Sequence, residues 1–475
     1  MNFYCYKAPG TKTDVLRTQE AFCEYANCGM TAVYLTGVNS FCFQGEEEWE
    51  SSNTKKCFEF ARNAGIERII MRDNRLYIEL IEEKNLVGEN GRFKTERELD
   101  DYVRNCMKPY AKEKGFYGLG LRDEPTWRHI ENCGLVYRSI KRVAKEFGHE
   151  NIYIQINLNP MIAPAYPLMD PNFAQMTEAE VYEKYIDAYL TATGADLISV
   201  DNYPFRPSYT GGRFLEGYYS CFQILLKQCQ KHGARLAFVL QSFELIHKTI
   251  PTATAGYRKI TSINEMFLQM NSVLGFGIRD IAFYTYEPDE QSEESPYRCE
   301  DSASFVTRTG EKNAIWYYGK TVIEHAKALE PILCRYDYVG SRISVHESVK
   351  FCQKHYLESE GIAFSDGTKK EPSALFDNTH TFARLESFSN DNDVMLITEL
   401  KAEKENSYLY MVQNVIDSPY KFDLVPMKVC LKFNENCKKI AIFRSKSWET
   451  VKIDNGVWET ELELGEAAWV IVSDK

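Results

Sequence analysis

Eight strand-like segments alternate with helix-like segments through the first 330 residues of the chain. The strand-like segments are apolar along nearly their whole length, which is typical of strands buried on both faces in a parallel sheet. Each of the first seven helix-like segments ends at a glycine, a common C-terminal stop for helices. Eight strand–helix units predict a (β/α)8 TIM barrel over residues 1–335. The expected strands are 2–8, 31–37, 67–73, 116–124, 151–159, 195–203, 235–243 and 279–287.

A doubly wound open sheet is the alternative for such an alternating chain. It would normally carry a glycine-rich nucleotide loop after its first strand, and residues 8–14, APGTKTD, lack that pattern. After residue 335 the pattern changes to short β-rich segments separated by turn residues. These segments predict a C-terminal antiparallel β-sandwich domain over residues 336–475.

Charge and cysteine content limit the partners and the compartment. The net charge of −12 argues against a nucleic-acid partner, because such proteins usually present a basic face. No apolar run approaches the roughly 20 residues that cross a bilayer, and no signal-peptide pattern is visible. The 14 cysteines form no CxxC pairs and the 8 histidines show no paired spacing. We expect a cytoplasmic protein, or a secreted one if a signal peptide was removed, with no membrane partner, no metal and no cofactor; a homo-oligomer is left open.

Polar and aromatic residues stand at the carboxyl ends of the expected strands, where barrels of this kind carry their chemistry. Carboxylates, amides and aromatic rings are the groups that bind sugar hydroxyls and sugar ring faces. We therefore expect an oligosaccharide or glycoside as the substrate. The residues are Thr36 and Asn39 after the second strand, Asp73 after the third, Arg122, Asp123 and Glu124 after the fourth, Asn157 and Asn159 after the fifth, Asp201, Asn202 and Tyr203 after the sixth, Gln241 and Glu244 after the seventh, and Tyr284, Tyr286 and Glu287 after the eighth.

Residues 116–125, FYGLGLRDEP, place two adjacent acids at the end of the fourth strand. Glycoside cleavage needs a protonated carboxyl group that donates to the leaving oxygen, and Glu124 is the best candidate. A charged Asp123 beside it would help to keep Glu124 protonated, since like charges resist ionising together. The structural alternative is a pair of acids at a helix start, with Pro125 in the first turn.

Four segments resemble the clan-A glycoside hydrolases, in particular the barrels related to family-42 β-galactosidases and the "DEP" proteins of gut bacteria. They are YGLGLRDEP (117–125), ADLISVDNYPF (195–205), AFYTYEP (282–288) and residues 309–333. The resemblance implies a retaining enzyme that cleaves a terminal β-linked sugar, with Glu124 as the acid/base. The nucleophile of that clan is a Glu ending the seventh strand. Gln241 stands there in this chain, so Glu244, and after it Glu287, is the expected nucleophile.

The adjacent Asp–Glu pair also resembles the substrate-assisted hexosaminidases of families 20 and 123. That resemblance implies that Glu124 is the acid and that Asp123 orients the 2-acetamido group of the substrate, which acts as the nucleophile. Tyr286 or Tyr203 would then hold the acetamido oxygen. Three functions stay open: a β-galactosidase-like hydrolase, a β-N-acetylhexosaminidase and a non-catalytic carbohydrate-binding barrel.

Overall fold

The computed structural model describes most of the chain, and the statements below concern those residues only. The described ranges are 1–10, 14–35, 46–82, 85–161, 176–205, 211–249, 256–288, 293–345, 362–363, 369–370, 376–392, 394–415, 426–434, 437, 439–444 and 446–473.

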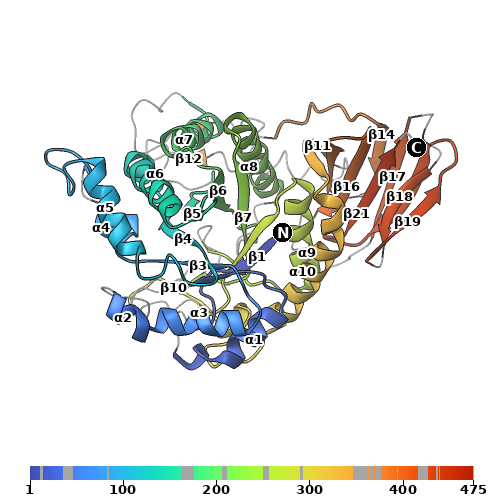
Figure 1. The fold of residues 1–475 in the computed structure, drawn as a ribbon. Helices are drawn as coiled ribbons and strands as arrows, with labels where there is room; N and C mark the ends of the chain where they lie inside the picture. The colour runs from blue at the N-terminus through green and yellow to red at the C-terminus, as the bar shows by residue number, and fades with distance from the viewer. Residues whose placement is uncertain are drawn as a thin grey trace.

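Eight parallel strands form one sheet in the order β1-β9-β7-β6-β5-β4-β3-β2. The N–H groups of Thr31 and Ala32, just before β2, donate to the carbonyl of Phe3 in β1, so the two outermost strands of that order meet. The predicted (β/α)8 barrel, followed along the chain by a β-sandwich, is therefore confirmed (Figure 1). The barrel strands are β1 (Asn2–Cys5), β2 (Val33–Leu35), β3 (Ile69–Met71), β4 (Phe116–Asp123), β5 (Tyr153–Leu158), β6 (Leu197–Asp201), β7 (Arg235–Gln241) and β9 (Asp280–Tyr284).

Helices surround this sheet, and several begin where the sequence supplies a capping side chain. Thr18, Thr95, Thr177 and Ser262 each accept a hydrogen bond from a backbone N–H in the first turn of the helix that follows. The helices are α1 (Gln19–Asn27), α2 (Glu46–Ser51), α3 (Asn53–Asn63), α4 (Ile78–Ile81), α5 (Glu96–Met107), α6 (Ile130–Glu146), α7 (Glu178–Thr193), α8 (Gly211–His232), α9 (Ile263–Gly275) and α10 (Ala314–Leu333). None of those in the described ranges is both long and apolar enough to cross a membrane.

Tyrosines fill the interior of the barrel, and two glycines of β4 make room for them. Tyr34 of β2 and Tyr153 of β5 both belong to the interior cluster. A Cβ atom at Gly120 would lie 1.8 Å from the hydroxyl of Tyr34, and one at Gly118 would lie 2.0 Å from the carbonyl oxygen of Tyr153. Gly120 is thus required by the ring of Tyr34, and Gly118 by the close approach of the β5 backbone at Tyr153.

The C-terminal region is a β-sandwich of two antiparallel sheets around a core of its own. Its strands are the orange and red arrows in Figure 1. One sheet contains β11 (Tyr336–Val345), β15 (Val394–Ala402), β16 (Ser407–Val415), β21 (Ala467–Ser473), β18 (Lys439–Arg444) and β19 (Ser447–Lys452), and the other contains β14 (Leu385–Asn390), β17 (Met427–Phe433) and β20 (Val457–Leu462). Two short ladders pair β8 (Ile246–His247) with β10 (Tyr297–Arg298) and β12 (Ile362–Ala363) with β13 (Lys369–Lys370).

The sandwich packs against α9 of the barrel. Gln413 of β16 is fully buried, donates to the carbonyl of Leu268 at 3.0 Å and accepts from the hydroxyl of Ser272 at 2.9 Å. Met411 and Trp469 belong to the same apolar cluster as the barrel helices. The helical region ends with α10 and the β-rich region begins with β11, but because this core runs through both, the division into domains 1–335 and 336–475 stays a prediction.

Candidate active site

Asp123 and Glu124 lie at the end of β4, and a β-bulge determines how they face. Gly120 pairs with Gln155 and Arg122 with the next residue of β5, so one residue of β4 between them is unpaired. The extra residue reverses the alternation of side chains, and Asp123 instead of Arg122 turns toward the neighbouring strand end. Glu124 follows with a left-handed backbone, φ 44°, and its N–H donates to the carbonyl of Asn157 at 2.8 Å. Such a conformation is costly outside glycine and is concentrated at functional sites.

Asn157 joins Asp123 to a second acid, Asp201, at the end of β6. Its side-chain nitrogen donates to Asp123 Oδ1 at 3.1 Å and to Asp201 Oδ1 at 2.7 Å. Asp201 is buried, whereas Asp123 and Glu124 are exposed as whole residues, with burial acting on their carboxyl groups. Two carboxyl groups, from β4 and β6, therefore share one amide, and the charge of Glu124 acts on Asp201 beside them.

The surroundings of these acids favour their protonated forms. Burial, followed by the charge of Asp123, raises the pKa of Glu124 to about 7. Burial, followed by the charges of Glu124 and Asp123, raises the pKa of Asp201 well above its usual range. The solvent access of Glu124 and the strong effect of burial on its pKa agree if its carboxyl group is recessed among protein atoms but open to water. Glu124 can therefore both meet a ligand and carry a proton near neutral pH.

The charges of two cations, Lys7 and Arg72, act on Asp123. Burial raises the pKa of Asp123, while the hydrogen bond from Asn157 and the charges of Lys7 and Arg72 oppose that rise. Lys7 follows β1 and donates to the hydroxyl of Tyr284 at 2.9 Å, and the guanidinium of Arg72, after β3, lies 3.5 Å from the centre of the Tyr77 ring. Sequence reasoning missed Lys7 because the first strand was expected to run to residue 8, whereas β1 ends at Cys5.

An aromatic group lies beside the acids. The ring of Tyr203 packs edge-on against Phe243 at 4.9 Å and against Tyr257 at 5.3 Å, and lies 6.2 Å from Tyr284. Tyr203 and Phe243 are buried, and Tyr284 is partly exposed. Tyr284 is therefore the partly exposed ring of this group, and the ammonium of Lys7 lies 4.8 Å from the centre of that ring.

The structure does not bring the two expected nucleophiles to Glu124. Glu244 is buried among other charges: burial and Glu300 raise its pKa, while Lys259 and Arg298 lower it. Glu287 is fully buried, and its Oε1 accepts from the N–H of Gly10 at 2.6 Å. Neither residue is among the charges that act on Glu124.

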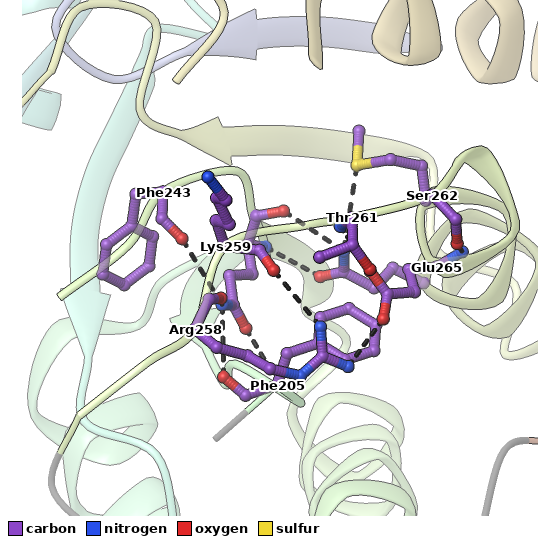
Figure 2. A network of polar contacts seen from close by, with 10 residues as sticks. Phe205, Phe243, Arg258, Lys259, Thr261, Ser262 and Glu265 are labelled. Atoms are coloured by element: carbon purple, nitrogen blue, oxygen red, sulfur yellow. Dashed lines mark hydrogen bonds and ion pairs between the residues drawn. The ribbon is translucent and has the colours of Figure 1, made fainter. Parts of the chain in front are cut away.

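The side chain of Gln241, the residue where the sequence resemblance puts a nucleophile, is bonded to backbone groups on both its oxygen and its nitrogen. Its Oε1 accepts from the N–H of Phe205 at 2.9 Å, and its Nε2 donates to the carbonyl of Arg258 at 2.7 Å. Figure 2 shows the network around Phe205 and Arg258, in which the guanidinium of Arg258 also donates to Glu265 at 2.6 Å. These bonds join the segments that follow β6 and β7. Gln241 is also fully buried, so its side chain is engaged in the interior and not at the acids.

Four other residues of the expected site are turned away from the acids or held by other partners. Asp73 accepts from Arg75 at 2.7 Å and from Tyr110 at 3.0 Å. Arg122 pairs with Glu82 and His129. Tyr286 packs between Tyr25 and Phe305, in the layer between strands and helices. Asn202 is buried, and its side chain bonds to the thiol of Cys221.

The side-chain amide of Asn159 donates to the carbonyl of Pro125 at 3.1 Å and so anchors the segment after Glu124. Thr36 and Asn39 lie outside the described residues. Within the described ranges, no group of three or more histidine, cysteine, aspartate or glutamate residues is suited to hold a metal ion. The expectations of no metal and no cofactor stay predictions.

Comparison with known proteins supports the barrel fold and does not assign the chain to a protein family. No family model matches the chain, and no curated protein sequence is similar to it. A glycosyl hydrolase, the α-amylase from Anoxybacillus, has a similar structure, with a TM-score of 0.50, 11% identity and coverage of 100% of this chain and 98% of its own. A family-27 β-L-arabinopyranosidase from Geobacillus stearothermophilus gives a TM-score of 0.49 at 10% identity, covering 100% and 95%. At such identities the likeness concerns the fold alone.

Proposed function

We propose that the protein is a glycoside hydrolase in which Glu124 donates a proton to the leaving oxygen. The observation that carries this proposal is a solvent-accessible carboxyl group at the end of β4, with its pKa raised to about 7 by burial and by Asp123. General acids of glycosidases need this property, because they must stay protonated at the pH of the reaction. The partly exposed Tyr284 and the glycosyl hydrolase with a similar fold support a sugar substrate.

Among the possible mechanisms, the positions of the acids favour the substrate-assisted one. A retaining enzyme with its own nucleophile needs a second carboxyl group about 5–5.5 Å from the acid. Glu244 and Glu287, the expected nucleophiles, both lie among other partners. If the 2-acetamido group of the substrate attacks instead, Asp123 needs only to orient it, and Asn157 already holds Asp123 in place. The substrate class is then a terminal β-linked N-acetylhexosamine.

A retaining hydrolase of β-galactosidase type is the second candidate. One observation favours it: Asp201 provides a further carboxylate within the group of acids around Glu124. In that mechanism Asp201 would be the nucleophile and no acetamido group would be required on the substrate, but Asp201 would have to lose its proton against the burial and the neighbouring charges that raise its pKa.

The two candidates separate on a panel of nitrophenyl β-glycosides. We expect release of nitrophenol from the N-acetylglucosaminide or N-acetylgalactosaminide, and inhibition by a thiazoline that mimics the cyclised acetamido intermediate. Hydrolysis of the galactoside, untouched by the thiazoline, would establish the second candidate instead. Sugar binding by calorimetry without any released product would reject both and leave a carbohydrate-binding barrel.

A matched pair of variants tests the roles of the acids. Glu124→Gln should abolish hydrolysis of substrates with poor leaving groups, whereas Glu244→Gln should leave turnover within about twofold, because Glu244 does not contact the acids in this site. Full activity of Glu124→Gln would remove Glu124 from the mechanism.

A further inference from the structure

A chain of hydrogen-bonded side chains runs beneath the acids, inside the barrel. Gln155 and Asn157 are two residues apart on β5, and Ser199 and Asp201 are two residues apart on β6, so each pair faces the same side of the sheet. Asn157 and Ser199 are paired in register. The four side chains therefore form one connected group that ends at the acids.

The hydroxyl of Ser199 fixes which way the amide of Asn157 points. It is buried, and it donates to Asn157 Oδ1 at 3.0 Å while it accepts from Gln155 Nε2 at 3.3 Å. A serine hydroxyl has one proton to give. With that proton given to Oδ1, Ser199 adds to the effect of the two acids in favouring the orientation in which the amide nitrogen of Asn157 faces Asp123 and Asp201. A reversed amide would place an oxygen against both acids.

The bonding of Gln155 shows that this orientation of the Asn157 amide lowers the stability of the folded protein. Its Nε2 also donates to the hydroxyl of Tyr6 at 2.6 Å, but its buried Oε1 has no hydrogen-bond partner in the part of the chain that the structure describes. A buried acceptor without a partner destabilises the folded protein. The arrangement supplies Ser199 with a donor and leaves the acceptor end of Gln155 unsatisfied.

We infer that Ser199 and Gln155 are positioning residues, which hold the amide of Asn157 with its donor toward Asp123 and Asp201 and so keep a charged carboxylate beside Glu124. The inference rests on the proposed role of Glu124 as proton donor. Neither residue touches the substrate in this account; both act through Asn157.

The direction of the effect follows from the groups that face these acids. Donation by Asn157 lowers the pKa of both Asp123 and Asp201 against the effect of burial. Without it Asp123 takes up a proton more readily, Glu124 loses its charged neighbour, and the pKa of Glu124 falls. The other titratable or charged groups that act on Asp123, or on which Asp123 acts, are Lys7, Arg72 and Glu79, together with Tyr6, Tyr34, Tyr77 and Tyr203.

The test is a pH titration of Glu124 in full-length protein labelled with ¹³C at the glutamate carboxyl carbons, with Glu124→Gln identifying the resonance. We expect the midpoint of Glu124 to fall by about one pH unit in Ser199→Ala. The alkaline limb of kcat/KM should move to lower pH by the same amount. Gln155→Leu, which leaves Ser199 in place, should produce a smaller shift in the same direction.

Two controls separate positioning from general loss of structure. Ser199→Thr keeps the hydroxyl and should restore the wild-type midpoint. Ser272→Ala removes another buried serine hydroxyl, which bonds the barrel to the sandwich, and should lower stability without moving the titration. An unchanged midpoint in Ser199→Ala would overturn the inference even in an active hydrolase. A shifted midpoint in a protein that cleaves no glycoside would support the positioning and reject hydrolysis.

Discussion

Glu124 combines a left-handed backbone with a carboxyl group that holds its proton to about pH 7. Neither property stabilises the folded chain, since positive φ is unfavourable for residues with a side chain and burial opposes the charge. Asn157 and Asn159 hold the backbone on both sides of this residue through the bonds to Glu124 N–H and Pro125 O. The surrounding structure therefore imposes the position of Glu124.

The first prediction concerns activity. Glu124→Gln should lower kcat/KM for substrates with poor leaving groups by about 10²–10⁴, because the leaving oxygen no longer receives a proton. Dinitrophenyl glycosides, whose leaving group needs no proton, should be affected much less. In the wild-type protein kcat/KM should decline as the pH rises through about 7, where Glu124 ionises. Equal loss on both kinds of substrate would contradict the role of general acid.

The second prediction concerns stability. The pKa of Glu124 is raised from 4.5 to about 7 on folding, so the folded state binds more protons than the unfolded state between these values. The free energy of unfolding therefore falls as the pH rises through this window. Glu124→Gln removes the penalty, and its melting temperature should exceed that of the wild type at pH 8 but not at pH 4. Calorimetry at the two pH values measures the difference, and a variant that is less stable at pH 8 would contradict it.

At the scale of elements, the sequence predicts the strands better than their ends. The fourth strand was expected over 116–124 and occupies Phe116–Asp123. The seventh and eighth strands were expected to reach 243 and 287, but they end at Gln241 and Tyr284. Glu244 and Glu287 lie beyond these ends and have left the sheet. Apolar patterning made the two strands too long and so predicted that both residues stand at the site, whereas the structure holds them with other partners.

The bulge in β4 is a second feature that patterning cannot show. Regular alternation from Gly120 would turn Arg122 toward the barrel axis and Asp123 away from it. Only the pairing with β5 reveals the extra residue that exchanges their places. The adjacent acids were visible in the sequence, but their partners Asp201, Lys7 and Arg72 depend on which strands become neighbours.

The third prediction belongs to this strand. Gly120→Ala should lower the free energy of unfolding by about 1–3 kcal/mol, because its methyl group would overlap Tyr34. Chemical denaturation measures the loss. In a Tyr34→Leu background the same substitution should cost less, as a double-mutant cycle would show. Equal costs in both backgrounds would mean that the close approach to Tyr34 does not require the glycine.

At the scale of the whole molecule, the sandwich is attached through α9 by both apolar and polar groups. α9 and α10 lie between the barrel and the sandwich in Figure 1. Gln413 donates to carbonyls of α9 and of the turn at Gly465, so a residue from one part satisfies backbone groups in both. The composition change near residue 335 predicts that a second β-rich part exists, but not which barrel helix it covers.

The fourth prediction tests this attachment. Gln413→Leu keeps the volume but leaves two buried carbonyls without that donor, and should cost about 1–3 kcal/mol of stability. The exposed Gln230→Leu is the matched control and should stay within about 0.5 kcal/mol of the wild type. Thermal unfolding followed by calorimetry compares them. A Gln413→Leu protein as stable as its control would show that apolar packing alone holds the sandwich.

The way Gln241 is bonded limits how this barrel can evolve. A point mutation in a glutamine codon gives glutamate, so a carboxylate at this position is genetically close. A carboxylate could still accept from Phe205, but it could not donate to the carbonyl of Arg258, and it would place a charge where no water reaches. A glutamate at the end of β7 would therefore require rebuilding the segments on either side of it, so this strand end is committed to joining those segments.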